Sequence, residues 1–408
     1  MYMKTMKTFG LLLLGVAVLA GCKQKEGSAE DEGNALSLEY FAFQEEEDGP
    51  WGLMATDGTV LVKPKFNGYM SCVVNDRFYV QEDDVYTIYT ADERPKKIGT
   101  YKECGSFVSD LCPVQDMNDN IFYIDKDGKK AFDLTEIDGK TVTGAFNFFC
   151  GRAMVCLDGT TWGYIDENGD TAIPFKFADA WNFNDDVAIV YIDNPTYEEG
   201  DMGKWAVIDT DGNKLFTKRF SDVKPSEFRY ADGLLEVTDA NDNYMLIDKN
   251  GNVVQKMKEG CFTNYIHDGI FTVYNNQTEK TGLMDKDGEW IIRPKFQAMS
   301  FNGSLLVCAE EDEQYSLYNM DGEKVAKLPH GYVNLFEKEF KDSDSYLLVG
   351  SWEDGYQLVD SEGNVVDTDY TIHGYNTGYN WGFMVSTGDE EYYEEEYDED
   401  YEEADSIM

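Results

Sequence analysis

The sequence predicts an all-β protein made of tandem β-hairpin repeats that form a β-propeller-like array. Two observations carry this prediction: a turn glycine recurs along the chain, and runs of alternating or continuous apolar residues flank each copy. Helical periodicity is weak throughout, and no phosphate-binding glycine loop is followed by a helix, so nucleotide chemistry is not predicted. The recurring glycines are Gly58, Gly128, Gly169, Gly212, Gly251, Gly288, Gly322 and Gly363.

Three segments show the repeat most clearly and align without a gap. They are Trp51 to Phe66 (WGLMATDGTVLVKPKF), Trp162 to Phe177 (WGYIDENGDTAIPFKF) and Thr281 to Phe296 (TGLMDKDGEWIIRPKF). Each begins with an aromatic or β-branched residue and a glycine, has a second glycine at the turn, and closes with proline and phenylalanine. Asp-Gly and Asn-Gly dipeptides suit the positive φ angles of a two-residue hairpin turn. Each copy therefore predicts a β-hairpin.

Another strand precedes each hairpin, and the linkers between units contain aromatic residues. The linker Ala180 to Asp185 (AWNFND) is expected to supply a short fourth strand or a turn. A degenerate copy fits between Gly58 and Gly128, with Tyr86 to Tyr89 as a strand and the turn at Asp92 and Glu93. The preceding strands are LEYFAF (38–43), RAMVCL (152–157), VAIVYI (187–192), GLLEVT (233–238), GIFTVY (269–274), SLLVCA (304–309) and YLLVGS (346–351).

Counting the degenerate copy, residues 36–388 contain about nine units of about 39 residues, close to the size of a four-stranded propeller blade. A ring would leave no exposed ends, and Trp381 to Ser386 (WGFMVS) is expected to pair with the first unit as the closing strand. Propellers usually have four to eight blades. The alternatives are therefore that some copies merge into one blade, or that the array is an open β-solenoid or superhelix.

This pattern resembles the WG-containing repeat family, whose consensus joins a Trp-Gly strand, an Asp-Gly turn and an Ile-Pro-Phe ending. The resemblance spans residues 36–388. It implies repeated β units and leaves the activity undefined, because functions in the family are mostly undefined. The match is specific in the repeats at Trp51, Trp162 and Thr281, fair at Trp205, and weak near Ile121, Tyr244, Tyr315 and Tyr356, where the tryptophan or the proline is missing.

The first residues have the layout of a secretory signal peptide. Lys4 and Lys7 precede an uncharged, apolar run from Thr8 to Gly21, and this run is shorter than the roughly 20 residues of a spanning helix. It ends in Leu-Ala-Gly-Cys, which resembles the lipobox of bacterial lipoproteins. The resemblance implies cleavage after residue 21 and a diacylglycerol on Cys22, which would anchor the chain to a membrane.

Residues 22–35 form an acidic, polar segment that predicts a flexible tether. An acidic tract behind the lipid resembles the signal that exports lipoproteins across the outer membrane, so display on the cell surface is expected over the periplasmic face. Residues 389–408 predict a disordered acidic tail, because Asp389 to Asp405 contains twelve acidic residues, four tyrosines and no base.

The formal charge of −45 makes nucleic acid and anionic lipid surfaces poor partners. A hydrophobic content of 42% is nevertheless sufficient for a continuous core. Cysteines in strand-like runs are predicted to be buried thiols. These are Cys72, Cys112, Cys156 and Cys308, whereas Cys104 with Cys112 and Cys150 with Cys156 remain candidate disulfides.

Signatures of catalysis, metal binding and cofactors are lacking. His267, His330 and His373 are far apart in sequence, so neither a zinc site nor a Ser/His/Asp triad is predicted. The turns at Asp125 and Asp285 resemble the start of a calcium loop, but their glycine comes two positions too early.

Tryptophans fall into two groups, one in register with the repeat and one outside it. Trp51, Trp162 and Trp205 share one position of the unit and are expected to stack in the core. The candidate binding residues are the tryptophans outside that position: Trp181, Trp290, Trp352 and Trp381.

These features together favour a membrane-anchored scaffold that binds an envelope protein or a glycan, and not an enzyme. The alternative is a glycan-active hydrolase that uses paired carboxylates.

Overall fold

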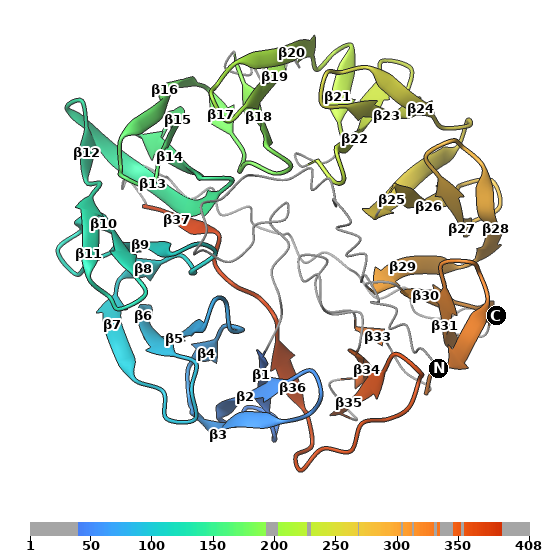
Figure 1. The fold of residues 1–408 in the computed structure, drawn as a ribbon, viewed down its shortest axis with the longest axis horizontal. Helices are drawn as coiled ribbons and strands as arrows, with labels where there is room; N and C mark the ends of the chain where they lie inside the picture. The colour runs from blue at the N-terminus through green and yellow to red at the C-terminus, as the bar shows by residue number, and fades with distance from the viewer. Residues whose placement is uncertain are drawn as a thin grey trace, which may run out of the picture.

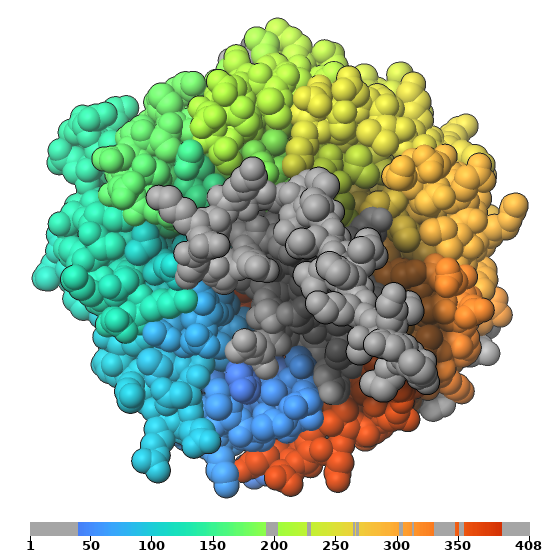
Figure 2. Space-filling model, viewed as in Figure 1, coloured from blue at the N-terminus to red at the C-terminus, as the bar shows by residue number. Residues whose placement is uncertain are grey.

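The computed structural model describes residues 40–192, 203–226, 230–267, 269–302, 305–311, 314–329, 333–334, 346–351 and 355–385. These residues form nine antiparallel sheets, which follow one another in chain order around a ring (Figure 1). The space-filling view shows neighbouring sheets packed side by side around that ring (Figure 2). The described part of the chain is therefore a β-propeller of nine blades, as the repeat count predicts.

The first four blades include both ends of the described chain. Blade 1 combines β1 (Tyr40–Gln44), β2 (Trp51–Ala55) and β3 (Val60–Phe66) with β36 (Gly374–Asn376). Blade 2 contains β4 (Tyr69–Met70), β5 (Arg77–Glu82), β6 (Val85–Thr90) and β7 (Lys97–Tyr101), and blade 3 contains β8 (Glu103–Cys104), β9 (Leu111–Gln115), β10 (Ile121–Asp125) and β11 (Lys130–Asp133). Blade 4 contains β12 (Glu136–Ile137), β13 (Lys140–Phe149), β14 (Arg152–Leu157), β15 (Thr161–Ile165), β16 (Thr171–Phe177) and β37 (Gly382–Met384).

The remaining blades complete the ring. Blade 5 contains β17 (Asp179–Ala180), β18 (Val187–Tyr191), β19 (Lys204–Asp209) and β20 (Lys214–Arg219), and blade 6 contains β21 (Val223–Pro225), β22 (Leu234–Asp239), β23 (Tyr244–Asp248) and β24 (Val253–Lys256). Blade 7 contains β25 (Cys261–His267), β26 (Ile270–Asn275), β27 (Lys280–Asp285) and β28 (Trp290–Phe296), and blade 8 contains β29 (Ala298–Asn302), β30 (Leu305–Ala309), β31 (Tyr315–Asn319) and β32 (Lys324–Lys327). Blade 9 contains β33 (Val333–Asn334), β34 (Tyr346–Ser351) and β35 (Gly355–Asp360).

The predicted strands and their order are confirmed. All seven predicted preceding strands are present: they overlap β1 in blade 1, β14 in blade 4, and the second strand of blades 5 to 9. The linker at Ala180 supplies the short inner strand β17. The degenerate copy is real as well, because β6 pairs with β7 across the turn that contains Asp92 and Glu93.

The glycine of the Trp-Gly pair is explained by a bulge in the facing strand. In blade 7, Thr281 faces Phe296 and Leu283 faces Ile292, so three residues around Pro294 lie opposite the single Gly282. A β-carbon on Gly282 would lie 2.5 Å from the carbonyl oxygen of Ile292 and 2.7 Å from the nitrogen of Pro294. Blades 1 and 4 have the same register. Proline suits the bulge because it has no N–H to pair.

The Asp-Gly turns differ from the prediction of two-residue turns. In the fourth blade, the N–H of Gly169 donates to the carbonyl of Asp166 at 2.9 Å, and the N–H of Asp166 donates to the carbonyl of Asp170 at 2.9 Å. This pattern is a three-residue loop in which a type I turn precedes a left-handed glycine, with φ +84° at Gly169. Only the glycine needs a positive φ, so the preceding residue is unrestricted in type.

Two-residue turns of the predicted kind occur elsewhere in the blade. They join the inner strand to the second strand, as at Asn75 and Asp76, where both residues have positive φ angles of 51° and 61°. The flanking residues Val74 and Arg77 exchange two backbone hydrogen bonds. In blade 2, this turn and the turn between β6 and β7 lie at the same end, and a second two-residue turn, at Asp83 and Asp84, joins β5 to β6 at the opposite end.

The ring closes, but not through the predicted strand. β36 pairs antiparallel with β1, with Phe43 opposite Tyr375, so a strand near the end of the described chain completes blade 1. The predicted closing segment, Trp381 to Ser386, instead contributes β37, which pairs with β13 of blade 4. The closed ring also excludes the open solenoid.

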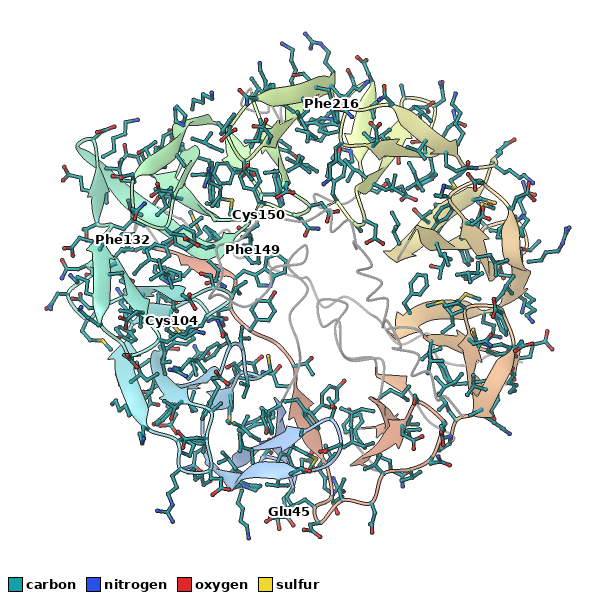
Figure 3. All side chains as sticks on the ribbon, viewed as in Figure 1. Glu45, Cys104, Phe132, Phe149, Cys150 and Phe216 are labelled. Atoms are coloured by element: carbon teal, nitrogen blue, oxygen red, sulfur yellow. The ribbon has the colours of Figure 1, made fainter. Side chains whose placement is uncertain are left out.

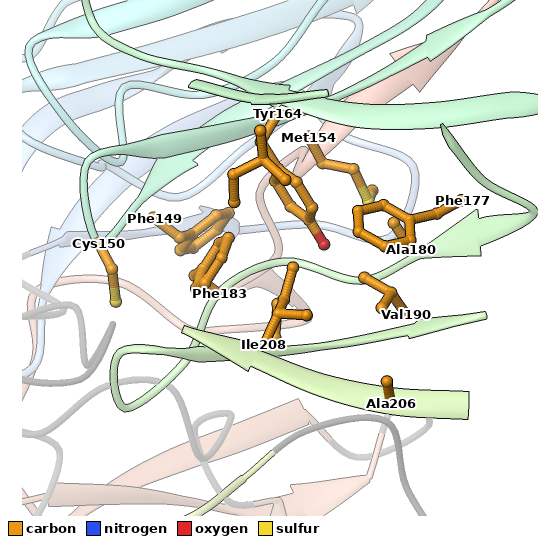
Figure 4. Packing of buried hydrophobic residues seen from close by; sticks show 12 residues of the cluster. Phe149, Cys150, Met154, Tyr164, Phe177, Ala180, Phe183, Val190, Ala206 and Ile208 are labelled. Carbon is orange, nitrogen blue, oxygen red and sulfur yellow. The ribbon is translucent and has the colours of Figure 1, made fainter. Parts of the chain in front are cut away.

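Apolar side chains fill the interfaces between adjacent blades. One cluster joins Phe149, Tyr164 and Phe177 of blade 4 to side chains of β17, β18 and β19 in blade 5 (Figure 4). Trp205 is fully buried between blades 5 and 6, and its indole N–H donates to the carbonyl of Val223 at 2.8 Å. Each interface is thus a small core shared by two repeats.

The cysteines behave as core residues. Cys72, Cys112, Cys156 and Cys308 are fully buried, as predicted. Burial raises the pKa of Cys308 to about 12, which keeps its thiol neutral. Neither candidate disulfide forms, because Cys104, Cys112 and Cys156 are free thiols.

The bulge predicts a strict requirement for glycine at position 282. The substitution Gly282→Ala should lower the free energy of unfolding by about 1–3 kcal/mol, because the added methyl group meets backbone atoms that cannot move aside. Urea unfolding measures the change. The control Ile291→Ala truncates an exposed side chain on the facing strand and should have little effect. Equal stability of the two variants would contradict this account of the glycine.

Candidate binding surface at the inner rim

The C-terminal segment 374–385 crosses the inner side of the ring from blade 1 to blade 4, and we call it the strap (Figure 1). It begins with β36 and ends with β37. Between these strands it bonds to blade 2, where the N–H of Cys72 donates to the carbonyl of Gly378 at 3.1 Å. The side-chain amide of Asn376 also donates to the carbonyl of Met70 at 2.6 Å.

Asn380 ties the strap to three blades at once. Its side-chain oxygen accepts a hydrogen bond from the hydroxyl of Tyr79 in blade 2 at 2.9 Å, and its side-chain amide donates to the carbonyl of Cys104 in blade 3 at 3.0 Å. Its carbonyl accepts from the side-chain amide of Asn147 in blade 4 at 2.8 Å. Burial raises the pKa of Tyr79, so this hydroxyl stays protonated and acts as a donor.

The strap carries two stacked aromatic residues, Tyr379 and Trp381, at the inner side of the ring, which we call the inner rim. Trp381 is 39% exposed, lies parallel to Tyr379 with ring centroids 6.1 Å apart, and lies 5.8 Å from Phe149. Figure 3 places Phe149 and the neighbouring Cys150 at the inner side of the ring. The backbone of Trp381 is fixed because its carbonyl accepts from the N–H of Asn147 at 2.8 Å. An indole held in this way offers a flat apolar face with a polar edge.

The other candidate tryptophans are not brought together with Trp381. Trp181 is half-buried at the interface of blades 5 and 6, where its ring lies 5.0 Å from that of Tyr191. Trp290 is half-buried at the interface of blades 6 and 7. Trp352 and Cys22 lie outside the described residues. Of the in-register tryptophans, Trp205 is fully buried and Trp51 and Trp162 are half-buried.

Carboxylates in the hairpin turns accept backbone hydrogen bonds and so stabilise those turns. The side-chain oxygen of Asp285 accepts from the N–H groups of Asp287 and Glu289 at 3.0 and 2.9 Å, and Asp125 holds its own turn in the same way. At Asp239, the bonded Asn243 amide holds the carboxyl pKa below its usual range. Within the described ranges, no cluster of three or more His, Cys, Asp or Glu side chains could hold a metal ion.

Sequence reasoning missed the strap as a structural element. Asn376, Asn380 and Asn147 have no distinguishing position in the repeat, because the strap follows the last hairpin and has no repeat pattern of its own. One signal was present in the sequence. The stretch Gly374 to Asn380 (GYNTGYN) is rich in residues that form side-chain hydrogen bonds yet lacks a turn-glycine hairpin.

Comparisons with solved structures found matches that cover most of this chain. A crystal structure described as the eukaryotic initiation factor aligns with a TM-score of 0.54 and 12% identity, covering 83% of this chain and 97% of that chain. BamB from Moraxella catarrhalis aligns with a TM-score of 0.34 and 11% identity over 76% and 94% of the two chains. The C-terminal WD40 domain of Sif2 aligns with a TM-score of 0.37 and 11% identity over 67% and 89%. At these identities the similarity concerns the fold alone.

The fold defines the class of protein as a β-propeller, and a family model adds the type of repeat. The model described as WG containing repeat matches residues 162–194 and 282–309. These stretches include the copies at Trp162 and Gly282, where the bulge lies opposite the glycine. No curated protein matches the sequence.

The hydrogen bonds of Asn380 predict that removal of its side-chain amide lowers the stability of the protein. The substitution Asn380→Ala should lower the free energy of unfolding by about 1–3 kcal/mol, because it leaves the buried hydroxyl of Tyr79 without its acceptor. Chemical denaturation provides the measurement. The matched control is Asn118→Ala, which removes an exposed amide from a turn of blade 3. An Asn380 variant as stable as this control would show that the strap contributes little.

Proposed function

We propose that this chain is a membrane-anchored, surface-displayed lipoprotein whose propeller is a scaffold that binds a protein or a glycan of the cell envelope. The observation that supports this proposal best is Trp381, an exposed indole held rigidly at the inner rim. A large aromatic side chain that is ordered before binding loses little conformational entropy when a ligand covers it. Tryptophan is also among the residues that contribute most to binding at interfaces.

The stacked pair suits a flat, partly apolar ligand surface. Tyr379 supports one side of the Trp381 ring, while hydrogen bonds from Asn147 hold the backbone of the strap at Asn380 and Trp381. A sugar ring or an aromatic or proline side chain of a partner would cover the exposed indole and bond to its polar edge. The proposed ligands are therefore a glycan or a protein segment.

Membrane attachment rests on the first residues of the sequence. The described residues contain no helix that is long and apolar enough to cross a membrane. We infer that a diacylglycerol on Cys22, preceded by Leu-Ala-Gly, supplies the anchor and that residues 22–35 tether the propeller to it. The acidic tether supports display on the outer face of the outer membrane.

A glycan-active hydrolase is not favoured over a binding scaffold. Such an enzyme needs two carboxyl groups on either side of one glycosidic bond, one of them with a raised pKa. Burial raises the pKa of both Glu103 and Asp179, but these residues lie in blades 3 and 5, with blade 4 between them. We assign no catalytic residue.

The proposed anchor predicts that the thiol of Cys22 is required for membrane association of the chain. In cells grown with a clickable fatty acid, the full chain should be labelled and should sediment with membranes. The variant Cys22→Ala should lose the label and move to the soluble fraction, because the lipid is its only proposed attachment. Cys261→Ala controls for cysteine substitution in general. Labelling of the Cys22 variant would refute the assignment.

The proposed binding site predicts that substitution of Trp381 weakens ligand binding, whereas substitution of Trp290 does not. On a glycan array and in pull-down from envelope extract, Trp381→Ala should weaken ligand capture by about tenfold or more, as expected for the loss of a central aromatic residue. Trp290→Ala, at the interface of blades 6 and 7, should retain capture in a folded protein. If neither assay yields a ligand for the wild-type chain, or if the Trp381 variant binds normally, the inner rim is not the site.

A further inference from the structure

Basic side chains gather on the outermost strands of the blades. The eight outer strands β3, β7, β11, β16, β20, β24, β28 and β32 contain thirteen lysines and arginines and one acidic residue, Asp133. In the whole chain, acidic residues outnumber basic ones by 79 to 34. We call the basic residues on these strands, which are exposed except for the half-buried Lys218, the outer belt. Basic residues are therefore concentrated on the outer strands, although the chain as a whole is acidic.

Most cations of the outer belt have no ion-pair partner in the described part of the chain. Lys130 pairs with Asp133 and Lys324 pairs with Glu310, and the other eleven have no carboxylate within 4.0 Å among the described residues. In blades 4 and 5 these are Lys176, Lys214, Lys218 and Arg219. Unpaired cations are unexpected on a surface with so many acids nearby.

Some of these cations lie far along the strand from the acidic turns. Lys176 comes seven residues after the turn glycine Gly169, which is about 20 Å along a strand. That separation exceeds the Debye length of about 8 Å at physiological ionic strength. Lys176 also lies 5.3 Å from the centroid of the Phe177 ring, which holds its ammonium group close to the outer strand. Lys176 and Lys218 therefore lie away from the turn carboxylates, whereas Lys214 follows the turn glycine Gly212 by only two residues.

Apolar side chains accompany the cations. Leu215 is 36% exposed between Lys214 and Lys218 on β20. Comparable exposed residues are Val254, Ile291 and Val325 on the outer strands of blades 6 to 8. A ligand for this surface needs negative charge at close spacing together with apolar or aromatic groups.

The C-terminal tail of the same chain has this chemistry. Residues 389–405 contain twelve acidic residues and four tyrosines without a base. The strap ends in blade 4, where the N–H of Val385 donates to the carbonyl of Thr143 at 2.7 Å. The 23 residues beyond it can extend about 80 Å, whereas a compact chain of 408 residues has a radius of gyration of about 22 Å.

We propose that the acidic tail docks on the outer belt of its own chain, across β16 and β20 of blades 4 and 5. The carboxylates pair with Lys176, Lys214, Lys218 and Arg219, and tyrosine rings cover Leu215. The remaining charge of the body, −45 minus −12 or −33, repels the tail only weakly at this range because salt screens distant charges. Docking in cis is favoured because a tethered segment has an effective concentration of about millimolar.

The test measures binding of a fluorescent peptide of residues 389–405 by anisotropy. A chain truncated after Gly388 should bind the peptide, and the full chain should bind it at least about tenfold more weakly because its own tail occupies the site. Raising the salt to about 1 M, where the Debye length is about 3 Å, should abolish binding. Equal binding to both chains, or binding that survives high salt, would overturn the proposal.

Charge reversal locates the site. In the truncated chain, Lys214→Glu, Lys218→Glu and Arg219→Glu together should weaken peptide binding by about tenfold or more. The matched control changes the same number of exposed lysines off the belt, with Lys140→Glu, Lys258→Glu and Lys286→Glu, and should bind as before.

A second variant and a second measurement keep the test decisive. If the triple variant does not fold, Lys176→Glu with Lys218→Glu replaces it, with one cation changed in each blade. Equal affinity of belt and control variants would contradict the site. Sedimentation should show a full chain that stays monomeric, since a dimer that depends on the tail would mean that the tail docks on a second copy instead.

Discussion

Closure of the ring is the constraint on which the rest of this structure depends. Each sheet has two apolar faces and can bury them only against its neighbours, so an open row of nine would expose one face at each end. Pairing of β36 with β1 removes both ends, because it joins the last part of the described chain to the first blade. The interface clusters, such as that of Phe149 and Tyr164 with blade 5, then repeat around the circle without interruption.

Closure leaves two kinds of strand edge, and the chain treats them differently. On the outside, proline and lysine recur in the fourth strands, as in Lys63 to Phe66 and Arg293 to Phe296, and these residues oppose pairing with another sheet. On the inside, the strap covers the edge of β13 with β37 and bonds to the short inner strands of blades 2 and 3. The outer belt and the strap thus both protect strand edges. The same residues also form the two surfaces for which binding is proposed.

The strap links the architecture to the candidate site. The same hydrogen bonds that tie Asn380 to blades 2, 3 and 4 also set the position of Trp381. Many acidic residues instead stabilise turns through their own side chains, as Asp125 and Asp285 do. The exposed indole of Trp381 is therefore the basis of the candidate site.

The sequence by itself determined the hairpin unit, its nine copies and the buried position of Trp205, because turns, alternation and the glycine opposite the bulge act within a few residues of each other. It did not determine the turn type, since Asp-Gly suits both two- and three-residue loops. Only the tertiary structure decided that β36 closes the ring and that Trp381 joins blade 4. Free strand edges offer equivalent backbone hydrogen bonds, so the choice among them depends on contacts between residues as distant as Asn147 and Asn380. The exposure of Trp381, in contrast to Trp181 and Trp290, follows from that choice.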